Sequence, residues 1–308
     1  MILQTGMRTD IPAFYSEWFM NRVHEGYVLV RNPYHTEQVT RYEITPEVVD
    51  LIAFCTKNPA PMMPYIQELK DYGQYWFVTI TPYGAELEPN VPQKADVIKN
   101  FQKLYDMVGI NSIGWRYDPV LINSKYTVDY HISAFKRIAE QLLGYTETCI
   151  ISFVDLYEKV KRNAPEIREV SDSEQVMIVK SFAEIGKSYG ITIKGCHESK
   201  KLAKYGVDMS GCLNKDVYEK ALGVALNLPK KKSQRDCNCF FGTDIGAYNS
   251  CGHFCRYCYA NANIQSVKRN MVHHNPKSPF LIGESLPNDK VSNAKQYSYI
   301  NSQLSLFR

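Results

Sequence analysis

The sequence predicts an α/β fold whose parallel strands form a full or partial (β/α) barrel. Short apolar segments rich in β-branched residues alternate with amphipathic segments about seven times, a pattern typical of strands joined by crossover helices. Most of the apolar segments are followed by polar residues, and no G-x-G-x-x-G follows the first one. The missing glycine pattern disfavours the main alternative, a doubly wound sheet that binds a dinucleotide. The recurring polar residues favour the barrel, because the carboxyl ends of barrel strands share one mouth.

Seven segments have the composition expected of buried parallel strands. They are residues 1–5, 49–55, 74–81, 112–117, 149–154, 190–195 and 243–248. Four further segments carry apolar residues at helical spacing. They are residues 11–23, 94–108, 128–143 and 172–190. Pro12 in the first turn and Gly190 at the last position are typical helix start and stop signals.

The chain divides into three expected parts. Residues 1–236 should contain the barrel strands and helices, with a hairpin or extended insertion near 25–44. Residues 237–270 form a cysteine-rich segment that should complete the same barrel. Residues 271–308 should form a C-terminal tail that packs on this domain.

Composition and charge limit the possible partners. The chain has neither a signal-peptide pattern at its start nor an apolar run long enough for a membrane span, so we expect a cytoplasmic protein without a membrane partner. Residues 187–308 contain 18 Lys and Arg against 8 Asp and Glu, which leaves 18 against 24 in residues 1–186. The basic part makes a nucleic-acid partner possible, but no recognisable binding module accompanies it, so this reading is not favoured.

The nine cysteines are unevenly placed. Cys55 and Cys149 lie in or beside apolar segments and are interpreted as packing residues. The remaining seven lie between residues 196 and 258, which indicates metal chemistry rather than a disulfide framework in a chain without a secretory signal.

Three of these seven form the motif C-x3-C-x2-C, at Cys251, Cys255 and Cys258. Thiolates are soft ligands that select zinc or iron–sulfur clusters. A structural zinc site needs four protein ligands, and the next candidate, His253, lies inside the loop itself. Three thiolates without an obvious fourth indicate a [4Fe–4S] cluster with one iron left open.

With the aromatic Tyr257 before its last cysteine, this motif resembles the cluster loop of radical S-adenosylmethionine (radical SAM) enzymes. The resemblance implies an enzyme in which the open iron binds SAM and an electron cleaves it to a 5′-deoxyadenosyl radical. That radical would abstract hydrogen from a substrate. The resemblance also implies an electron donor such as a flavodoxin or ferredoxin, and an adenine contact at Tyr257 and the backbone beside it.

The position of the motif departs from the usual family order, in which the cluster loop follows the first barrel strand. Here it follows the last predicted strand, so we expect a circularly permuted barrel with residues 243–248 beside residues 1–5. The chain also resembles an uncharacterised bacterial family that carries this motif at its C-terminus. A more remote likeness to spore photoproduct lyase lies in the T-K-N-P segment at residues 56–59 and the R-Y-D-P segment at residues 116–119.

Four cysteines remain for a second site. Cys196, Cys212, Cys237 and Cys239 provide the number of thiolates that a protein-held [4Fe–4S] cluster or a structural zinc requires. We favour an auxiliary iron–sulfur cluster, with zinc as the alternative. The pair Cys237 and Cys239 could place two ligands on one site, and Cys196 follows a predicted strand, so it should lie at the same mouth.

The polar residues at the predicted strand ends are candidates for holding SAM and substrate. The predicted catalytic residues are Arg8, Asp10, Lys57, Arg116 and Glu198, and the predicted cofactor-binding residues are Tyr257, Asn58 and Asp118. His197 is a further candidate, and His197 or Glu198 could instead support the Cys196 site. The competing hypotheses are a non-enzymatic zinc or iron–sulfur module that binds nucleic acid, and a redox protein that only passes electrons.

Overall fold

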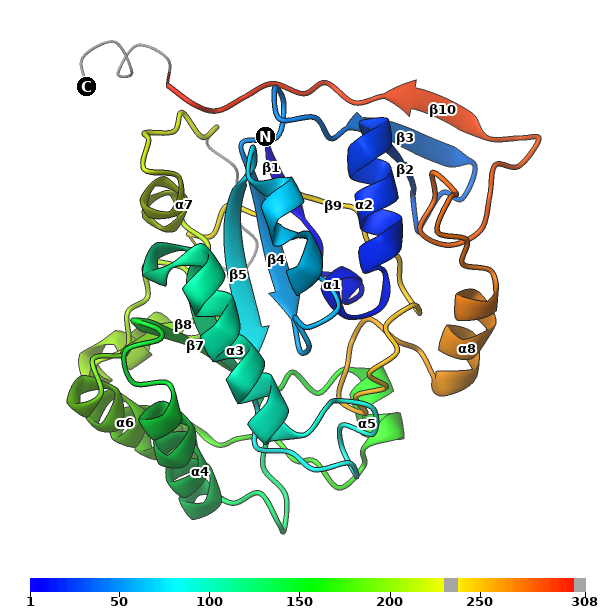
Figure 1. The fold of residues 1–308 in the computed structure, drawn as a ribbon. Helices are drawn as coiled ribbons and strands as arrows, with labels where there is room; N and C mark the ends of the chain where they lie inside the picture. Colours follow the sequence, from blue (N-terminus) through cyan, green and yellow to red (C-terminus); the bar gives the residue numbers. More distant parts are fainter. Residues whose placement is uncertain (230–237, 302–308) are drawn as a thin grey trace.

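The computed structural model describes residues 1–229 and 238–301 and contains a seven-stranded parallel β-sheet (Figure 1). Its strands are β1 (Ile2–Gln4), β4 (Leu51–Thr56), β5 (Gly73–Thr79), β6 (Ile113–Val120), β7 (Thr148–Phe153), β8 (Thr192–Gly195) and β9 (Thr243–Asp244). All seven predicted strands are confirmed, although β9 is shorter than its predicted segment.

The order of the strands in the sheet is β9-β1-β4-β5-β6-β7-β8. From β1 to β8 this is also their order along the chain, so the winding does not reverse as it does in a doubly wound sheet. β9 pairs in parallel with β1, with Thr243 opposite Leu3, which confirms the predicted neighbourhood of these two segments. Over residues 1–229 and 238–301, β8 and β9 remain at opposite edges, so the sheet is not closed into a barrel.

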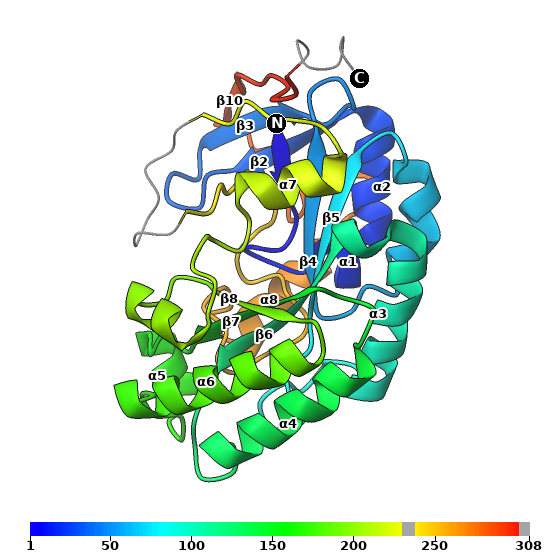
Figure 2. The ribbon, with the colours of Figure 1, turned by 90° about the vertical axis from the view of Figure 1, so that its left-hand side faces the viewer.

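Four helices cover one face of the sheet and follow its curve from the right side of Figure 2 round to the bottom. They are α2 (Ser16–Glu25), α3 (Lys94–Val108), α4 (Val128–Gln141) and α6 (Asp172–Ser188). Their apolar side chains share one large core with alternate residues of the strands, such as Ile52 and Phe54 of β4. The predicted helices are confirmed, except that the first is divided at Tyr15 into α1 (Ile11–Phe14) and α2.

Local sequence signals account for the ends of these helices. Thr127 accepts a hydrogen bond from the backbone amide of Tyr130 and begins α4. Ser171 and Glu174 form a capping box at the start of α6. Gly26 ends α2 with a φ of 77°, a left-handed conformation that glycine adopts without strain.

The opposite face of the sheet is covered by α7 (Lys215–Leu222) and by the segments that carry the second cysteine group (Figure 2). The other set of alternating strand residues, including Leu51, Ala53 and Phe77, packs here against Tyr218 of α7. Successive residues of a strand point to opposite faces, so one strand can serve both cores. This second core contains three thiols, those of Cys196, Cys212 and Cys239.

A small second sheet contains β2 (Tyr27–Arg31), β3 (Gln38–Glu43) and β10 (Lys290–Asn293). The antiparallel pair β2–β3 confirms the predicted hairpin, and β10 adds to it in parallel. The C-terminal segment then passes the start of the chain, where the backbone amide of Tyr299 donates to Asp50 at 2.8 Å.

The remaining described elements lie in connections between the main strands or, in the case of α8, between β9 and β10. They are η1 (Met63–Leu69), η2 (Ile110–Ser112), η3 (Lys200–Tyr205), α5 (Glu158–Asn163) and α8 (Ile264–Val272). Among the residues that the structure describes, none of the helices combines the length and the apolar character that crossing a membrane requires.

Candidate functional site

The cysteine loop follows β9 directly and is fixed by hydrogen bonds from distant parts of the chain. The hydroxyl of Tyr15 donates to the carbonyl of Ser250 at 2.6 Å, and the amide of Asn90 donates to the carbonyl of Gly252 at 2.7 Å. Within the loop, the side-chain amide of Asn261 donates to the carbonyl of Cys251 at 2.8 Å. Phe254 has a φ of 57°, a left-handed conformation that tertiary contacts must hold in place for such a residue.

The three thiols of this loop lie close enough to influence one another. Burial raises the pKa of Cys251, and the charges of Asp10, Cys258 and Cys255 raise it further. Burial raises the pKa of Cys255 as well, against the attraction of the Lys57 ammonium. The backbone amide of Ala260 donates to the sulfur of Cys258 at 3.3 Å. The motif therefore brings three half-buried cysteines into electrostatic interaction with one another, and their ligation of a cluster stays a prediction.

Two predicted site residues, Asp10 and Lys57, lie beside these thiols. Asp10 begins α1 by accepting from the amide of Ala13 at 3.0 Å, and its second oxygen accepts from the backbone amide of Lys57 at 2.8 Å. The same oxygen lies 2.8 Å from Nε2 of His253, which is 2% exposed. The loops after β1, β4 and β9 thus meet at one carboxylate.

The sequence analysis missed Glu88, which is the centre of a buried polar network. It forms ion pairs with Lys57, at 2.8 Å, and with Lys94. Its Oε1 accepts hydrogen bonds from the hydroxyls of Thr81, at 2.6 Å, and Tyr257. Burial alone would raise the pKa of Glu88, but the two lysines outweigh burial and lower it to about 2. No sequence signal marks this glutamate, because it lies in a loop far from any motif.

This network also accounts for the orientation of Tyr257. Its side chain is 8% exposed, bonds to Glu88 and packs edge-to-face on Tyr83, with ring centroids 5.7 Å apart. The ring of Tyr257 therefore points into the protein. An adenine would contact the backbone beside Tyr257 rather than the ring. That contact stays a prediction.

The second cysteine group is also brought together. The sulfur of Cys212 lies 3.4 Å from that of Cys196 and 3.3 Å from that of Cys239. All three side chains are at most 7% exposed. Gly211 precedes Cys212 with a φ of 99°, and a β-carbon there would lie 3.1 Å from the backbone nitrogen of Cys239. Convergence of these three residues is confirmed, whereas Cys237 lies outside the described residues.

Arg116 of β6 lies beside the second cysteine group. It forms an ion pair with Asp118, and its Nη1 lies 3.5 Å from the sulfur of Cys55. Burial alone would lower the pKa of Arg116, but Asp118 and the thiols of Cys55, Cys196 and Cys212 outweigh burial and raise it. Its Nε is buried without a hydrogen-bond partner among the described residues. Arg116 is thus the cation that the second cysteine group faces.

The cysteines interpreted as packing residues differ in their surroundings. Cys149 is fully buried in the main core, as predicted. Cys55 packs partly on the second core, but it also contacts Arg116 and lies close to Tyr259, which in turn interacts with Cys258. Cys55 therefore belongs to the region between the two cysteine groups.

The other predicted site residues are distributed around this region. Arg8 pairs with Asp244 of β9, and a buried oxygen of that carboxylate has no hydrogen-bond partner among the described residues. Glu198 accepts from the backbone amide of Phe153 at 2.7 Å, next to the Cys196 loop. Asn58 accepts from the amide of Ala60 and forms a local turn. Their predicted contacts with SAM or substrate stay predictions.

His197 occupies a strained position in the same region. It has a φ of 59°, and its ring lies parallel to that of Phe241 at 5.8 Å. Its Nδ1 is buried without a hydrogen-bond partner among the described residues. An unpartnered ring nitrogen held in this way is available to a ligand or to an ordered water molecule.

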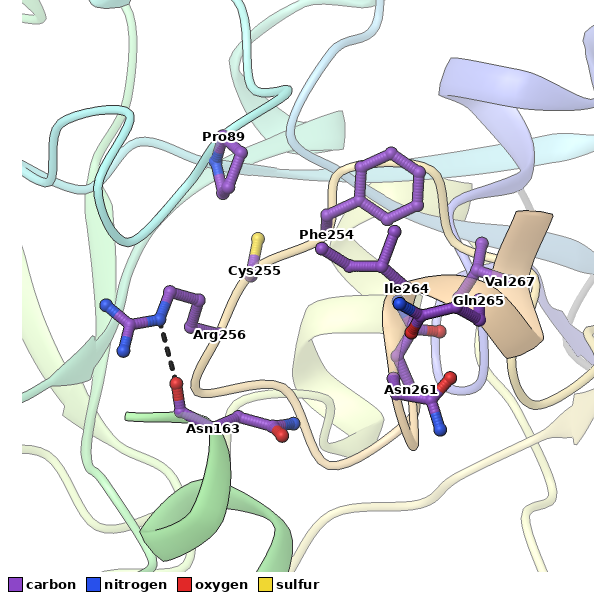
Figure 3. A pocket seen from close by; sticks show the side chains of 10 residues that line it. Pro89, Asn163, Phe254, Cys255, Arg256, Asn261, Ile264, Gln265 and Val267 are labelled. Atoms are coloured by element: carbon purple, nitrogen blue, oxygen red, sulfur yellow. Dashed lines mark hydrogen bonds between the residues drawn. The ribbon is translucent and has the colours of Figure 1, made fainter. Parts of the chain in front are cut away.

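A pocket of about 280 Å³ lies on the outer side of the cysteine loop (Figure 3). Cys255 and Phe254 line it, together with residues of α5 and α8. In Figure 3 the guanidinium of Arg256 donates to the backbone carbonyl of Asn163, which joins the loop to α5. Of the three cysteines in the loop, Cys255 lines this pocket, and neither Arg116 nor the described cysteines of the second group are among its lining residues.

The chain matches one family model over residues 2–260, described as a domain of unknown function, DUF1848. This chain belongs to the DUF1848 family. No curated protein and no solved structure matches the chain. The match to the DUF1848 model ends two residues after Cys258, so it includes both groups of cysteines. It therefore establishes family membership without assigning an activity.

The cysteine side chains are not arranged as ligands around a metal ion would be. In the part of the chain that the structure describes, no group of three or more His, Cys, Asp or Glu side chains is set to hold a metal ion. In the second cysteine group, the sulfurs at 3.3 and 3.4 Å are closer than the roughly 3.8 Å expected for ligands of a tetrahedral zinc with bonds of about 2.3 Å. Metal binding would require these thiols to lose their protons and move apart.

Proposed function

We propose that this protein is a radical SAM enzyme whose [4Fe–4S] cluster is held by Cys251, Cys255 and Cys258. The observation that carries the proposal is that three half-buried cysteines interact electrostatically with one another beside Asp10 and Lys57, where the loops after β1, β4 and β9 meet. A cluster with three protein thiolates keeps one iron free for another ligand.

The donor set fits such a cluster. Each of the three thiols interacts electrostatically with at least one other, and Lys57 provides a positive charge beside Cys255 and Cys258. The amide of Ala260 already donates to the sulfur of Cys258, which is the type of contact that stabilises a ligating thiolate. His253 is engaged by Asp10 and by the carbonyl of Asn90, so it is not positioned as a fourth ligand.

The strand order supports a permuted barrel of the radical SAM type. β9 stands before β1 in the seven-stranded sheet, so the strand that leads into the cysteine loop is first in space although it is the last strand of this sheet along the chain. The strands that follow wind in one direction without reversal. The sheet remains open between β8 and β9 over the described residues, so the proposed form is a partial barrel.

A cluster held by Cys251, Cys255 and Cys258 would supply one electron to the sulfonium of SAM, and this reduction would cleave the C5′–S bond to give methionine and a 5′-deoxyadenosyl radical. The residues of this chain would bind and orient the reactants. We assign the polar side chains of Arg8, Arg116, Asp118 and His197 to SAM or substrate. This assignment rests on their places at the carboxyl ends of the strands and on the unpartnered nitrogens of Arg116 and His197.

We further propose an auxiliary [4Fe–4S] cluster at Cys196, Cys212 and Cys239, with Cys237 as the fourth ligand and zinc as the alternative metal. Three buried thiols in mutual contact face the Arg116 guanidinium, whose charge would offset the negative charge of an all-thiolate cluster. Neutral core cysteines have no need of such a cation.

One experiment tests the enzyme hypothesis. Protein prepared anaerobically is reconstituted with iron and sulfide and incubated with SAM and dithionite, and 5′-deoxyadenosine is measured by liquid chromatography. We expect its formation, and we expect Cys255→Ala to abolish it. Tightly bound zinc with no iron after reconstitution would instead support the hypothesis of a zinc module that binds nucleic acid.

A further inference from the structure

We propose that the surface formed by α5, α8 and the outer side of the cysteine loop is the docking site for a small acidic electron-transfer protein. We call it the α5–α8 surface, and it comprises residues 158–163, 254–256 and 261–272. The inference rests on the proposed function, because reductive cleavage of SAM consumes an electron that must reach the cluster from outside the chain.

The first argument is access to the cluster ligands. The pocket of about 280 Å³ opens on this surface, and of the three cysteines in the loop it is Cys255 that lines it (Figure 3). The opposite side of Cys255 faces Lys57 and Glu88 in the protein interior. Electron transfer slows steeply with distance, so a donor seated over this pocket has a short route to the cluster through Cys255.

The second argument is the charge around the pocket. The three ranges of the α5–α8 surface contain six basic residues, namely Lys159, Lys161, Arg162, Arg256, Lys268 and Arg269, against the acidic residue Glu158, while Asp155 and Glu166 lie just outside these ranges in the sequence. Glu158 pairs with Lys161 and Glu166 pairs with Arg256. Within the described residues, the other four basic side chains form no ion pair with a carboxylate, which leaves a positive surface suited to an acidic partner.

The third argument is the exposed apolar area of α8. Ile264 is 42% exposed and Val272 is 81% exposed. Lys268 lies between them at i+4 spacing, so the three residues follow one exposed stripe of the helix. Apolar side chains surrounded by charged ones are typical of protein interfaces. This combination favours a protein partner over a nucleic acid, which uses basic and aromatic side chains.

The test compares two double charge reversals. Lys268→Glu with Arg269→Glu alters the α5–α8 surface, and Lys180→Glu with Lys187→Glu makes the same change of charge on α6. That control pair lines a pocket of about 650 Å³ at the β8 edge. All four side chains are exposed, and none belongs to the proposed cluster sites or to the residues assigned to SAM or substrate. Each reconstituted protein is mixed in a stopped-flow instrument with reduced flavodoxin, and cluster reduction is followed by its visible absorbance.

We expect the α8 variant to be reduced by flavodoxin at least tenfold more slowly at low ionic strength, with the difference disappearing at high salt. Reduction by dithionite should be unchanged, and the α6 control should behave like the wild type. Equal effects in both variants, or no effect in either, would overturn the docking site. So would an unchanged reduction rate accompanied by loss of oligonucleotide binding in the α8 variant, since the surface would then serve nucleic acid.

The two proposals fail in different ways. A wild-type protein that forms no iron–sulfur cluster refutes the proposed function, and the docking site falls with it. A cluster that dithionite reduces, together with a flavodoxin rate that is insensitive to the α8 charges, refutes the docking site alone.

Discussion

The Nε2 atom of His253 lies 2.8 Å from Oδ2 of Asp10, although 243 positions separate the two residues in the sequence. The same oxygen of Asp10 accepts from the backbone amide of Lys57. One carboxylate therefore holds the cysteine loop against the ends of β1 and β4. This contact explains how a motif near the end of the chain can serve a site built largely by its beginning.

The two cysteine groups should bind iron independently. If both clusters form, reconstituted protein should contain about eight irons per chain. Cys251→Ala should lose about four of them, and Cys212→Ala should lose the other four while SAM binding is retained. Colorimetric iron analysis of the purified variants measures this. Cys149→Ala is the control, because Cys149 is a packing residue of the main core and should leave the iron content unchanged. Loss of all iron in either ligand variant would contradict separate sites.

Arg116 should raise the reduction potential of the proposed auxiliary cluster. Arg116→Met removes the positive charge that acts on Cys196 and Cys212. The reduced cluster carries one more negative charge than the oxidised one, so the variant should have a more negative reduction potential. A spectroscopic redox titration measures the shift, and Arg116→Lys should restore most of it. A similar potential in the wild type and both variants would show that Arg116 is remote from any cluster at this site.

Glu88 should contribute strongly to stability. Glu88→Gln leaves the partly buried Lys57 and Lys94 without the charge of the buried carboxylate, and removal of one partner from such a network costs about 3–5 kcal/mol. The matched control is Glu86→Gln, because Glu86 is half-exposed and pairs with an exposed lysine, so its loss should cost no more than about 1 kcal/mol. Urea unfolding followed by circular dichroism measures both. An equal loss of unfolding free energy in the two variants would indicate that water reaches the ion pairs of Glu88.

His131 should make the protein less stable in acid. It is fully buried, with Nδ1 2.8 Å from the hydroxyl of Tyr117 and Nε2 2.7 Å from the carbonyl of Leu121. Burial lowers its pKa from 6.5 to about 4. The unfolded chain therefore binds a proton at a higher pH than the folded one, so this contribution is complete above pH 6.5 and is lost as the pH falls towards 4.

The loss at His131 amounts to about 3 kcal/mol for a shift of this size. The measurement is the free energy of unfolding between pH 7 and pH 4. His131→Gln keeps a side chain that can hydrogen-bond but cannot take up this proton, so it should show a smaller loss over that range. An identical pH dependence in the variant and the wild type would contradict the assignment.

The amino-acid sequence determined the secondary structure to a large extent. Strand and helix periodicity is a local property, and segments such as 94–108 and 149–154 carry it in their own side chains. The three-thiol motif was equally evident, because its chemistry lies in the spacing of three neighbouring cysteines. The pairing of β9 with β1 followed from treating that motif as the end of a strand.

Only the tertiary structure decided which charges face these thiols. Glu88 and Lys94 lie in a loop and a helix without a distinguishing pattern, and they become a buried network only when the loops after β4 and β5 fold against Tyr257. The same holds for Arg116, whose position beside Cys55, Cys196 and Cys212 depends on the packing of segments that are far apart in the sequence. Electrostatic interactions act through space rather than along the sequence, so a linear pattern of residues does not contain them.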